Sequence, residues 1–545
     1  MRLSSVAVRT PLALAASFVL VTLPMAAQLR ESIEVRVLEL EVSVLDRDGK
    51  AVEGLTRDDF TVRVGRREVP IANFFAVRNG ALVSDAPREA NAPPAEETSI
   101  PTSLVIFIDD LHLSQHSHAR AVAALRRYVS TTIGPDTTAT LLRYNHTLDV
   151  RIRPTERAGA ILRELDQLAA MPSTDDIARE RRQLIRDIDD ILTAYRDDGR
   201  TPGGETPDTL LMRVERYAEH RTADVDHTLR AIERAIELAS AFSGRKVLLY
   251  VSDGLPQIPG LEVFEYFDRA TQRIGASVTG VFRADANAML RFDRTSAFRR
   301  LAQTAQRANV AFFSFDARGL RTDADRGPEA ASTLGTLSTT SMTTNDRSGL
   351  QFVAKETGGQ YVTNENSIDT VLARMSEQFT SYYSVGIQPP TDGEIRISVR
   401  NRPELRVITA RRRPPRTRED KLEQHLRSRL YTRASENPLE ATLGIGAASM
   451  NGSQCIVPVR LTIPQPQLPE ELTPRSVELR MVMLNELNDE SAIQTTNLWF
   501  EEGRIQHVMK LRIRPEKLTL SIAVSNPLSG ETSFLQADVD GGRCR

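Results

Sequence analysis

SLVIFIDDLHLS, residues 103–114, is the stretch of sequence that decides the fold. It begins as a run of large apolar residues from Leu104 to Ile108 and turns abruptly polar at Asp109 and Asp110. A short continuous apolar run is typical of a strand buried on both faces, as in a parallel sheet. In open α/β sheets, ligands bind beyond the carboxyl ends of the strands. The stretch therefore predicts a buried first strand with a polar end that faces a ligand.

The chain beyond this stretch alternates apolar, strand-like runs with helical periodicity. Further buried strands are predicted over four segments: 138–145, 245–254, 309–319 and 359–364. Strands that alternate with helices predict an α/β domain with a doubly wound, mostly parallel sheet, here over residues 103–381. Two insertions interrupt the pattern, a charged, partly helical one at 174–220 and a loop rich in Thr, Ser, Asp and Gly at 320–348.

Strand-like segments flank the α/β domain on both sides. Residues 33–79 alternate apolar and polar side chains and predict a small N-terminal β unit, followed by a linker rich in Ala, Pro and Glu at 80–102. Residues 382–413 return to strands, and we expect them to pair with the N-terminal β unit, so that the α/β domain is an insertion within it. A helical linker at 414–436 and a C-terminal β-sandwich at 437–545 complete the predicted organisation.

The N-terminus has the features of a secretory signal. Arg2 and Arg9 come before an apolar run at 12–23, and small residues follow as far as Ala27. The run is shorter than the roughly 20 apolar residues that a membrane-spanning helix needs. We therefore expect residues 1–27 to be a cleaved signal peptide and the chain to be periplasmic or extracellular, attached to a membrane only if the signal stays uncleaved.

The two cysteines, Cys455 and Cys544, both lie in the predicted C-terminal domain. In the oxidising compartment that export implies, such a pair is expected to form a disulfide. Two buried thiols are the alternative, because sequence alone does not give the geometry that a disulfide requires.

Charge and motifs exclude several classes of function. The 545-residue chain has 70 Lys and Arg against 72 Asp and Glu, a net charge of −2, which gives no electrostatic reason to expect a nucleic-acid partner. The run Ser252-Asp253-Gly254 is not the G-x-S-x-G of a serine hydrolase, and neither a zinc-binding H-E-x-x-H nor a phosphate-binding P-loop is present. We therefore expect that the protein is not an enzyme.

Oxygen-bearing side chains are predicted to gather at one edge of the sheet. Asp109 and Asp110 follow the first strand, Asp253 ends the strand at 245–254, and Thr222 is placed just before the helix that leads into that strand. Carboxylates and hydroxyls are ligands that Mg²⁺ and Ca²⁺ prefer. The same residues could instead cap helices and bond the backbone at the strand ends.

The order of these parts resembles a von Willebrand factor A domain, whose metal-ion-dependent adhesion site uses D-x-S-x-S, then a Thr, then an Asp. The flanking segments VSVLDRDGKAVEGLTRDDFTVRVG (42–65), ANVAFFSFDARGL (308–320) and SYYSVGIQPPTDGEIRISVR (381–400) are similar to exported VWFA-related proteins of Acidobacteria. The resemblance covers most of residues 35–412 and implies a von Willebrand factor A fold for the α/β domain.

The D-x-S-x-S motif is altered in this chain. If Asp109 is its first acid, both serine positions are leucines. If Asp110 is the first acid, Ser114 stands at the second serine position and His112 at the first. We prefer the second register because it keeps more oxygen ligands. His112 could be a ligand of Mn²⁺ or Zn²⁺, or a hydrogen-bonded histidine at the edge of the sheet.

The resemblance assigns the remaining ligands to Thr222 and Asp253 and implies one divalent cation, Mg²⁺, Mn²⁺ or Ca²⁺. In the family the ion recruits a carboxylate of a partner, so the implied function is an exported binding or adhesion module that engages a protein through the strand carboxyl ends. A metal-free structural or assembly component of the cell envelope is the alternative. The third hypothesis, a metal-dependent hydrolase that uses Asp109, Asp110 and Asp253, has no supporting motif.

Overall fold

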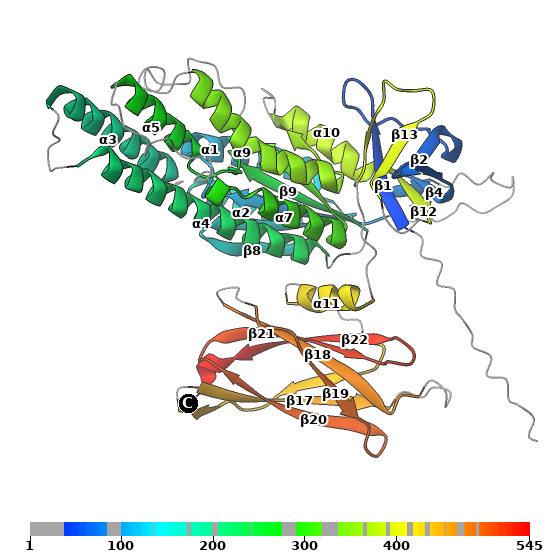
Figure 1. The fold of residues 1–545 in the computed structure, drawn as a ribbon. Helices are drawn as coiled ribbons and strands as arrows, with labels where there is room; N and C mark the ends of the chain where they lie inside the picture. Colours follow the sequence, from blue (N-terminus) through cyan, green and yellow to red (C-terminus); the bar gives the residue numbers. More distant parts are fainter. Residues whose placement is uncertain are drawn as a thin grey trace, which may run out of the picture. The chain divides into compact units, whose positions relative to one another are not determined.

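Figure 1 shows the fold in a computed structural model of the chain. It describes residue 242 and fifteen ranges: 38–83, 100–134, 136–171, 176–198, 205–240, 244–274, 290–318, 336–362, 368–388, 393–410, 418–430, 437–452, 454–465, 473–486 and 490–544. The expected signal peptide lies outside these residues, as does 84–99 of the expected linker. No helix found in the described part of the chain combines the length and the apolar character that crossing a bilayer requires.

The α/β domain is built on a six-stranded sheet in the order β11-β10-β9-β6-β7-β8. In chain order its strands are β6 (Thr102–Asp109), β7 (Thr137–Asn145), β8 (Thr147–Thr155), β9 (Arg245–Ser252), β10 (Val310–Asp316) and β11 (Tyr361–Val362). All neighbouring pairs are parallel except β7 and β8, which form an antiparallel hairpin. The mostly parallel sheet agrees with the alternation of strands and helices in the sequence.

Helices cover both faces of this sheet (Figure 1). They are α1 (Gln115–Thr132), α2 (Ala158–Ala169), α3 (Asp176–Asp198), α4 (Pro207–Ser240), α5 (Leu261–Arg273), α7 (Thr295–Ala308), α9 (Thr336–Thr357) and α10 (Ile368–Thr380). The side chains of β6 alternate between two hydrophobic cores: Val105 and Phe107 pack on the side of α4, α7 and α9, and Leu104, Ile106 and Ile108 on the side of α1, α2 and α10. Burial on both faces explains why β6 is apolar from Leu104 to Ile108.

Two helices differ from the sequence prediction. The prediction had a short helix, a break near Thr222 and a second helix, but α4 is continuous over 34 residues, so Thr222 lies inside a helix rather than before one. The segment 320–348 was predicted to be a loop, but α9 already begins at Thr336, while 319–335 lies outside the described ranges. Leu350 and Val353 of α9 are fully buried, and burial of this kind outweighs the weak helix propensity of a Ser- and Thr-rich sequence.

Strands from both sides of the α/β domain pair with each other. One sheet has the order β14-β1-β12-β4-β5, and a second has the order β13-β2-β3. Their strands are β1 (Leu38–Leu45), β2 (Phe60–Val64), β3 (Arg67–Val69), β4 (Ile71–Arg78), β5 (Ala81–Val83), β12 (Tyr382–Ile387), β13 (Ile395–Val399) and β14 (Arg406–Ile408). Because β12 lies between β1 and β4, the chain leaves this β unit, forms the α/β domain and returns, as the sequence analysis expected.

The C-terminal region contains the helix α11 (Arg418–Ser428) and two antiparallel sheets. The first sheet has β17 (Gln454–Pro464) paired with β15 (Thr442–Ile445), β16 (Ser449–Asn451) and β20 (Arg504–Ile513). The second has the order β19-β18-β21-β22, formed by β18 (Ser476–Asn485), β19 (Gln494–Trp499), β21 (Lys517–Ser525) and β22 (Thr532–Asp540). Alternate residues of both sheets meet in one hydrophobic cluster. On its other side, the second sheet contacts α11, since Ser521 Oγ donates to the carbonyl of Leu426.

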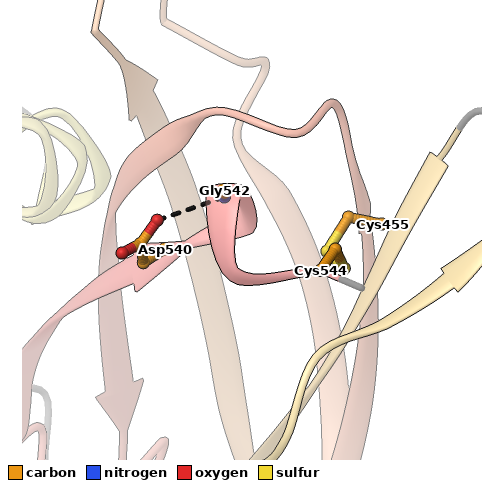
Figure 2. Close-up of a disulfide and its surroundings, with 4 residues drawn as sticks. All are labelled: Cys455, Asp540, Gly542 and Cys544. Carbon is orange, nitrogen blue, oxygen red and sulfur yellow. Dashed lines mark hydrogen bonds between the residues drawn. A yellow bond between two sulfur atoms is a disulfide. The ribbon is translucent and has the colours of Figure 1, made fainter.

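A disulfide joins Cys455 to Cys544, the pairing that the sequence analysis expected (Figure 2). Cys455 lies near the start of β17 and is fully buried, and Cys544 follows a 3-10 turn at Gly541–Arg543. The Asp540 carboxylate accepts a hydrogen bond from Gly542 N (3.1 Å) within this turn. The disulfide therefore fastens residues 541–544 to the first C-terminal sheet.

Candidate functional site

The candidate site is the edge of the α/β sheet where three neighbouring parallel strands end. Asp316 at the end of β10 lies opposite Ser252 at the end of β9, and Asp109 ends β6 beside them. We refer to these strand ends, together with residues 110–117 and 253–254, as the rim. Because ligands of open α/β sheets bind at this edge, the rim is the place where a recognition site is expected.

Asp109 is completely buried, and both of its carboxylate oxygens are engaged. His112 Nδ1 donates to Oδ2 (2.8 Å), the Tyr250 hydroxyl donates to the same oxygen, and the backbone N–H of His112 donates to Oδ1 (3.2 Å). Burial opposes protonation of the His112 imidazole, but the charge and hydrogen bond of Asp109 outweigh it and raise the His112 pKa above its usual value. The negative charge of Asp109 is thus balanced from within the protein.

Asp110 is also buried, and its partners come from β7 and α1. His118 Nδ1 donates to Oδ1 (2.8 Å), and Arg143 Nε donates to Oδ2. His118 Nε2 lies 3.1 Å from the carbonyl oxygen of Leu168, so each imidazole nitrogen faces an acceptor, and only the imidazolium form can donate to both. The bonds to Asp110 accordingly raise the His118 pKa, although burial opposes the shift. Asp110 therefore carries two internal cationic partners.

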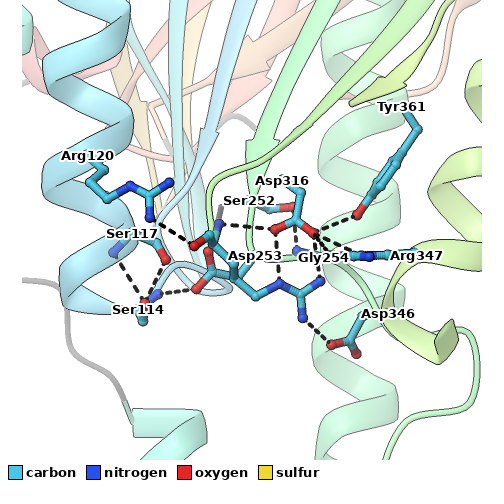
Figure 3. Close-up of polar contacts among 11 residues, drawn as sticks. Ser114, Ser117, Arg120, Ser252, Asp253, Gly254, Asp316, Asp346, Arg347 and Tyr361 are labelled. Atoms are coloured by element: carbon cyan, nitrogen blue, oxygen red, sulfur yellow. Dashed lines mark hydrogen bonds and ion pairs between the residues drawn. The ribbon is translucent and has the colours of Figure 1, made fainter. Parts of the chain in front are cut away.

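Two hydrogen bonds join the turn after β6 to the end of β9, and Figure 3 shows the one between Ser114 and Asp253. Ser114 N donates to Asp253 Oδ2 (3.0 Å), and Asp253 N donates to the carbonyl of His112 (3.1 Å). The Ser114 hydroxyl bonds Ser117, accepting from its backbone N–H (3.3 Å) and donating to its Oγ (2.8 Å), and so caps α1. Burial raises the pKa of Asp253 above its usual value.

Thr222 lies in the interior of α4, and its side chain is buried. Its hydroxyl oxygen has no hydrogen-bond partner among the residues described, and neither has Oδ1 of Asp253. A buried polar atom without a partner destabilises the fold, so these two oxygens are the predicted ligand atoms that most favour an added ligand.

Arginines next to the rim neutralise a further set of acids that the sequence analysis did not assign (Figure 3). Arg318 Nε donates to Asp316 Oδ1 (3.0 Å), and Arg318 Nη1 donates to Asp346 Oδ2 (2.9 Å). Arg347 Nε donates to Asp316 Oδ2 (3.1 Å). Burial opposes the charge of Arg318, but the two carboxylates outweigh it and raise its pKa, whereas burial raises the pKa of Asp346 to about 6. The spacing of Asp316 and Arg318 directly after a buried strand is the sequence signal that could have indicated this cluster.

These contacts decide how well the rim suits a divalent ion. Asp109 and Asp110 have their oxygens occupied by hydrogen bonds, and the Ser114 hydroxyl is used as a helix cap. Within the described ranges, no group of three or more His, Cys, Asp or Glu side chains is arranged to hold a metal. Only the orphaned oxygens of Thr222 and Asp253 fit the predicted ligand set. The donors present therefore suit a cation poorly, and the metal site stays a prediction.

No family model matches this chain, and no curated protein matches it. Solved structures that are similar to it include the vWF domain of the type V pili tip protein Mfa5 from Porphyromonas gingivalis, with 12% identity over 51% of this chain and 94% of that chain and a TM-score of 0.26. The three N-terminal domains of Mfa5 match with 10% identity over 86% and 78% of the two chains and a TM-score of 0.25. BatB from Bacteroides thetaiotaomicron matches with 12% identity over 51% and 98% and a TM-score of 0.23. TM-scores this low carry no argument about the function of this chain.

Proposed function

We propose that this chain is an exported binding module that engages a protein partner through the rim of its α/β domain, without a bound metal ion. The observation that carries the proposal is the pair of bonds between the β6–α1 turn and the end of β9, from Ser114 to Asp253 and from Asp253 to His112. These bonds fix the turn, and the next two residues, Gln115 and His116, are exposed. An exposed helix start that is held in place loses less conformational entropy on binding than a mobile segment.

The proposed site is metal-free because the protein's own cations already offset the charges of the acids at the rim. His118 and Arg143 already balance Asp110, while Arg318 and Arg347 balance Asp316, so the fold needs no bound cation to offset these acids. We expect Mg²⁺, Mn²⁺ and Ca²⁺ to leave the melting temperature unchanged. A bound ion at a hundred times its Kd would instead stabilise the folded state by about 2.7 kcal/mol. A metal-dependent rise that disappears in Asp253→Ala would contradict the proposal and support the metal site.

The partner is tested by capture from the native cell envelope, with and without a chelator. The same protein should be captured under both conditions, because binding is proposed to be independent of metal. Gln115→Arg places a new charge on the exposed side of the rim and should abolish capture. Ser130→Arg is the matched control, since Ser130 is also exposed but lies at the opposite end of the same helix. Equal capture by both variants would refute binding at the rim.

The export and the C-terminal architecture are parts of the same proposal. The disulfide supports an oxidising compartment, and the hydrophobic cluster shared by the two C-terminal sheets supports a β-sandwich. Capture that survives Gln115→Arg but requires residues 437–545 would favour the alternative, a structural or assembly component. We expect no turnover of ester or phosphate substrates, and activity that depends on Asp109 or Asp253 would revive the hydrolase hypothesis.

A further inference from the structure

The outward face of the first C-terminal sheet is basic. Along β20 the residues Ile505, Met509, Leu511 and Ile513 are buried, so the alternate positions point outward, and these include Arg504, Lys510 and Arg512. Arg460 points outward from the neighbouring strand β17, directly opposite Val508 of β20. We refer to Arg460, Arg504, Lys510 and Arg512 as the basic face.

One acid lies beside this face: Glu501, just before β20, stands opposite Arg504. The outward positions of the paired strands β15, β16, β17 and β20 are the four cations together with uncharged residues: Thr442, Gly444, Ser449, Asn451, Gln454, Ile456, Pro458, Thr462, Pro464, Gln506 and Val508. Within the part of the chain that the structure describes, none of the four cations forms a salt bridge. The contrast with the second sheet is clear, because its Arg480 is paired with Glu419 of α11 (3.0 Å) and with Glu478.

We infer that the basic face binds the surface of an anionic phospholipid bilayer. Arg504 and Arg512 are eight residues apart on one strand, so the cations extend over about 27 Å at a rise of about 3.4 Å per residue. They lie on the flat face of a sheet, which matches a plane of headgroups better than a narrow ligand. Val508 lies between them and is 50% exposed, with Ile456 and Pro458 half-buried on the next strand.

The exposed apolar atoms favour a bilayer over a soluble polyanion. Cations attract both kinds of anion, but an apolar side chain such as Val508 is removed from water only when it enters the boundary between headgroups and acyl chains. The face also has no aromatic side chain on which a sugar or a base could stack. The basic residues of an edge strand also hinder pairing with other strands, but that role needs no apolar residue between them.

Vesicle flotation with the full chain tests this inference. Vesicles with roughly 30% phosphatidylglycerol in phosphatidylcholine should bind the protein, and pure phosphatidylcholine vesicles should not. Binding should be lost on raising the salt from about 0.1 M to about 0.5 M, because salt screens charges near a surface. Equal binding to both kinds of vesicle, or binding to neither, would overturn the inference.

Substitutions locate the contact. Removing one cation near an anionic surface weakens binding by about fivefold, so Lys510→Gln with Arg512→Gln should weaken it roughly 25-fold. The matched control is Arg66→Gln with Arg67→Gln, which removes the same charge from the exposed hairpin between β2 and β3 of the N-terminal β unit. Val508→Ser should also weaken binding without any change of charge. Unchanged melting temperatures would show that the variants fold.

Two further results would count against a bilayer. If the control weakens binding as much as the double variant on the basic face, the contact depends on overall charge and not on this face. If heparin binds to the face and anionic vesicles do not, the ligand is a soluble polyanion and the inferred bilayer binding is wrong.

Discussion

The replacement of Asp110 by Ala separates an internal ion pair from a metal ligand. In the structure the Asp110 carboxylate is 3% exposed and holds His118 and Arg143, so its removal leaves two buried cationic groups without their partner. Breaking a buried ion pair from one side destabilises a protein by about 3–5 kcal/mol. For a domain of this size, each kcal/mol lowers the melting temperature by about 2–4 °C, so the expected decrease is on the order of 10 °C.

The assay is thermal unfolding of the full chain in the presence of a chelator, followed by calorimetry so that the transition of the α/β domain is resolved from the others. Arg143→Met should also destabilise this domain, but less, because Asp110 keeps its bond to His118. In the double variant the two changes should not add, and the coupling between them should be at least about 1 kcal/mol. Asp48→Ala, an exposed acid in a turn of the N-terminal β unit, controls for the loss of one negative charge.

The result that would refute this reasoning is an Asp110→Ala variant that is as stable as the wild type, or more stable, in the chelator. Ligand acids that surround an empty metal site repel one another, so removing one of them relieves the repulsion. A loss of stability that appears only when Mg²⁺, Mn²⁺ or Ca²⁺ is present would likewise show that Asp110 binds an ion.

Further expectations concern other parts of the structure. Burial raises the pKa of Asp346 from its ordinary value of 3.8 to about 6. Its contribution to stability is therefore present at low pH and is lost as the pH rises through about 6. In chemical denaturation, the free energy of unfolding of the wild type relative to Asp346→Asn should fall as the pH rises from 3.8 to about 6. The disulfide closes a loop of 89 residues, so Cys455→Ser with Cys544→Ser should lower the stability of the C-terminal sheets by about 4.5 kcal/mol in calorimetry, and added reductant should have no effect on that variant. Gly254 has φ +114°, and a Cβ there would lie 2.8 Å from Asp346 Cβ, so Gly254→Ala should cost about 1–3 kcal/mol by the same assay. Ser114→Ala removes a helix cap and should cost about 1 kcal/mol whether or not divalent ions are present.

The fold was largely predictable because its signals are local. The uninterrupted apolar run of β6 indicated a strand buried on both faces, and the alternation of such runs with helices indicated the parallel sheet. The break predicted near Thr222 was wrong, and the spacing of apolar residues in the sequence already indicated a continuous helix. Leu210, Val214, Ala218, Val225 and Leu229 form one buried stripe along α4, and Thr222 stands at the position where this stripe needs its next member. Thr222 was predicted to lie just before a helix, whereas the stripe continues through it.

The candidate site was less predictable because its contacts join residues far apart in the sequence. Asp109 meets Tyr250 across 141 residues, and Asp110 meets Arg143 across 33. Sequence could place both acids at the end of the first strand, but it could not show which direction each carboxylate takes or what lies there. Ser114 and Asp253 were placed correctly at one edge, since both follow strands that are neighbours in a parallel sheet.

The partners of these acids also bear on the proposed recognition of another protein at the rim. A metal ion that is held by a few carboxylates keeps an open coordination position, which a carboxylate of a partner can fill. Arg318 differs from such an ion because it is buried and its charge is already offset: Nε and Nη2 donate to Asp316, and Nη1 donates to Asp346. An acidic group of a partner would have to give up its hydration to reach this guanidinium. Under the proposed function, recognition at this rim therefore uses the shape and the neutral polar groups at the exposed start of α1 around Gln115, and a chelator should leave it intact.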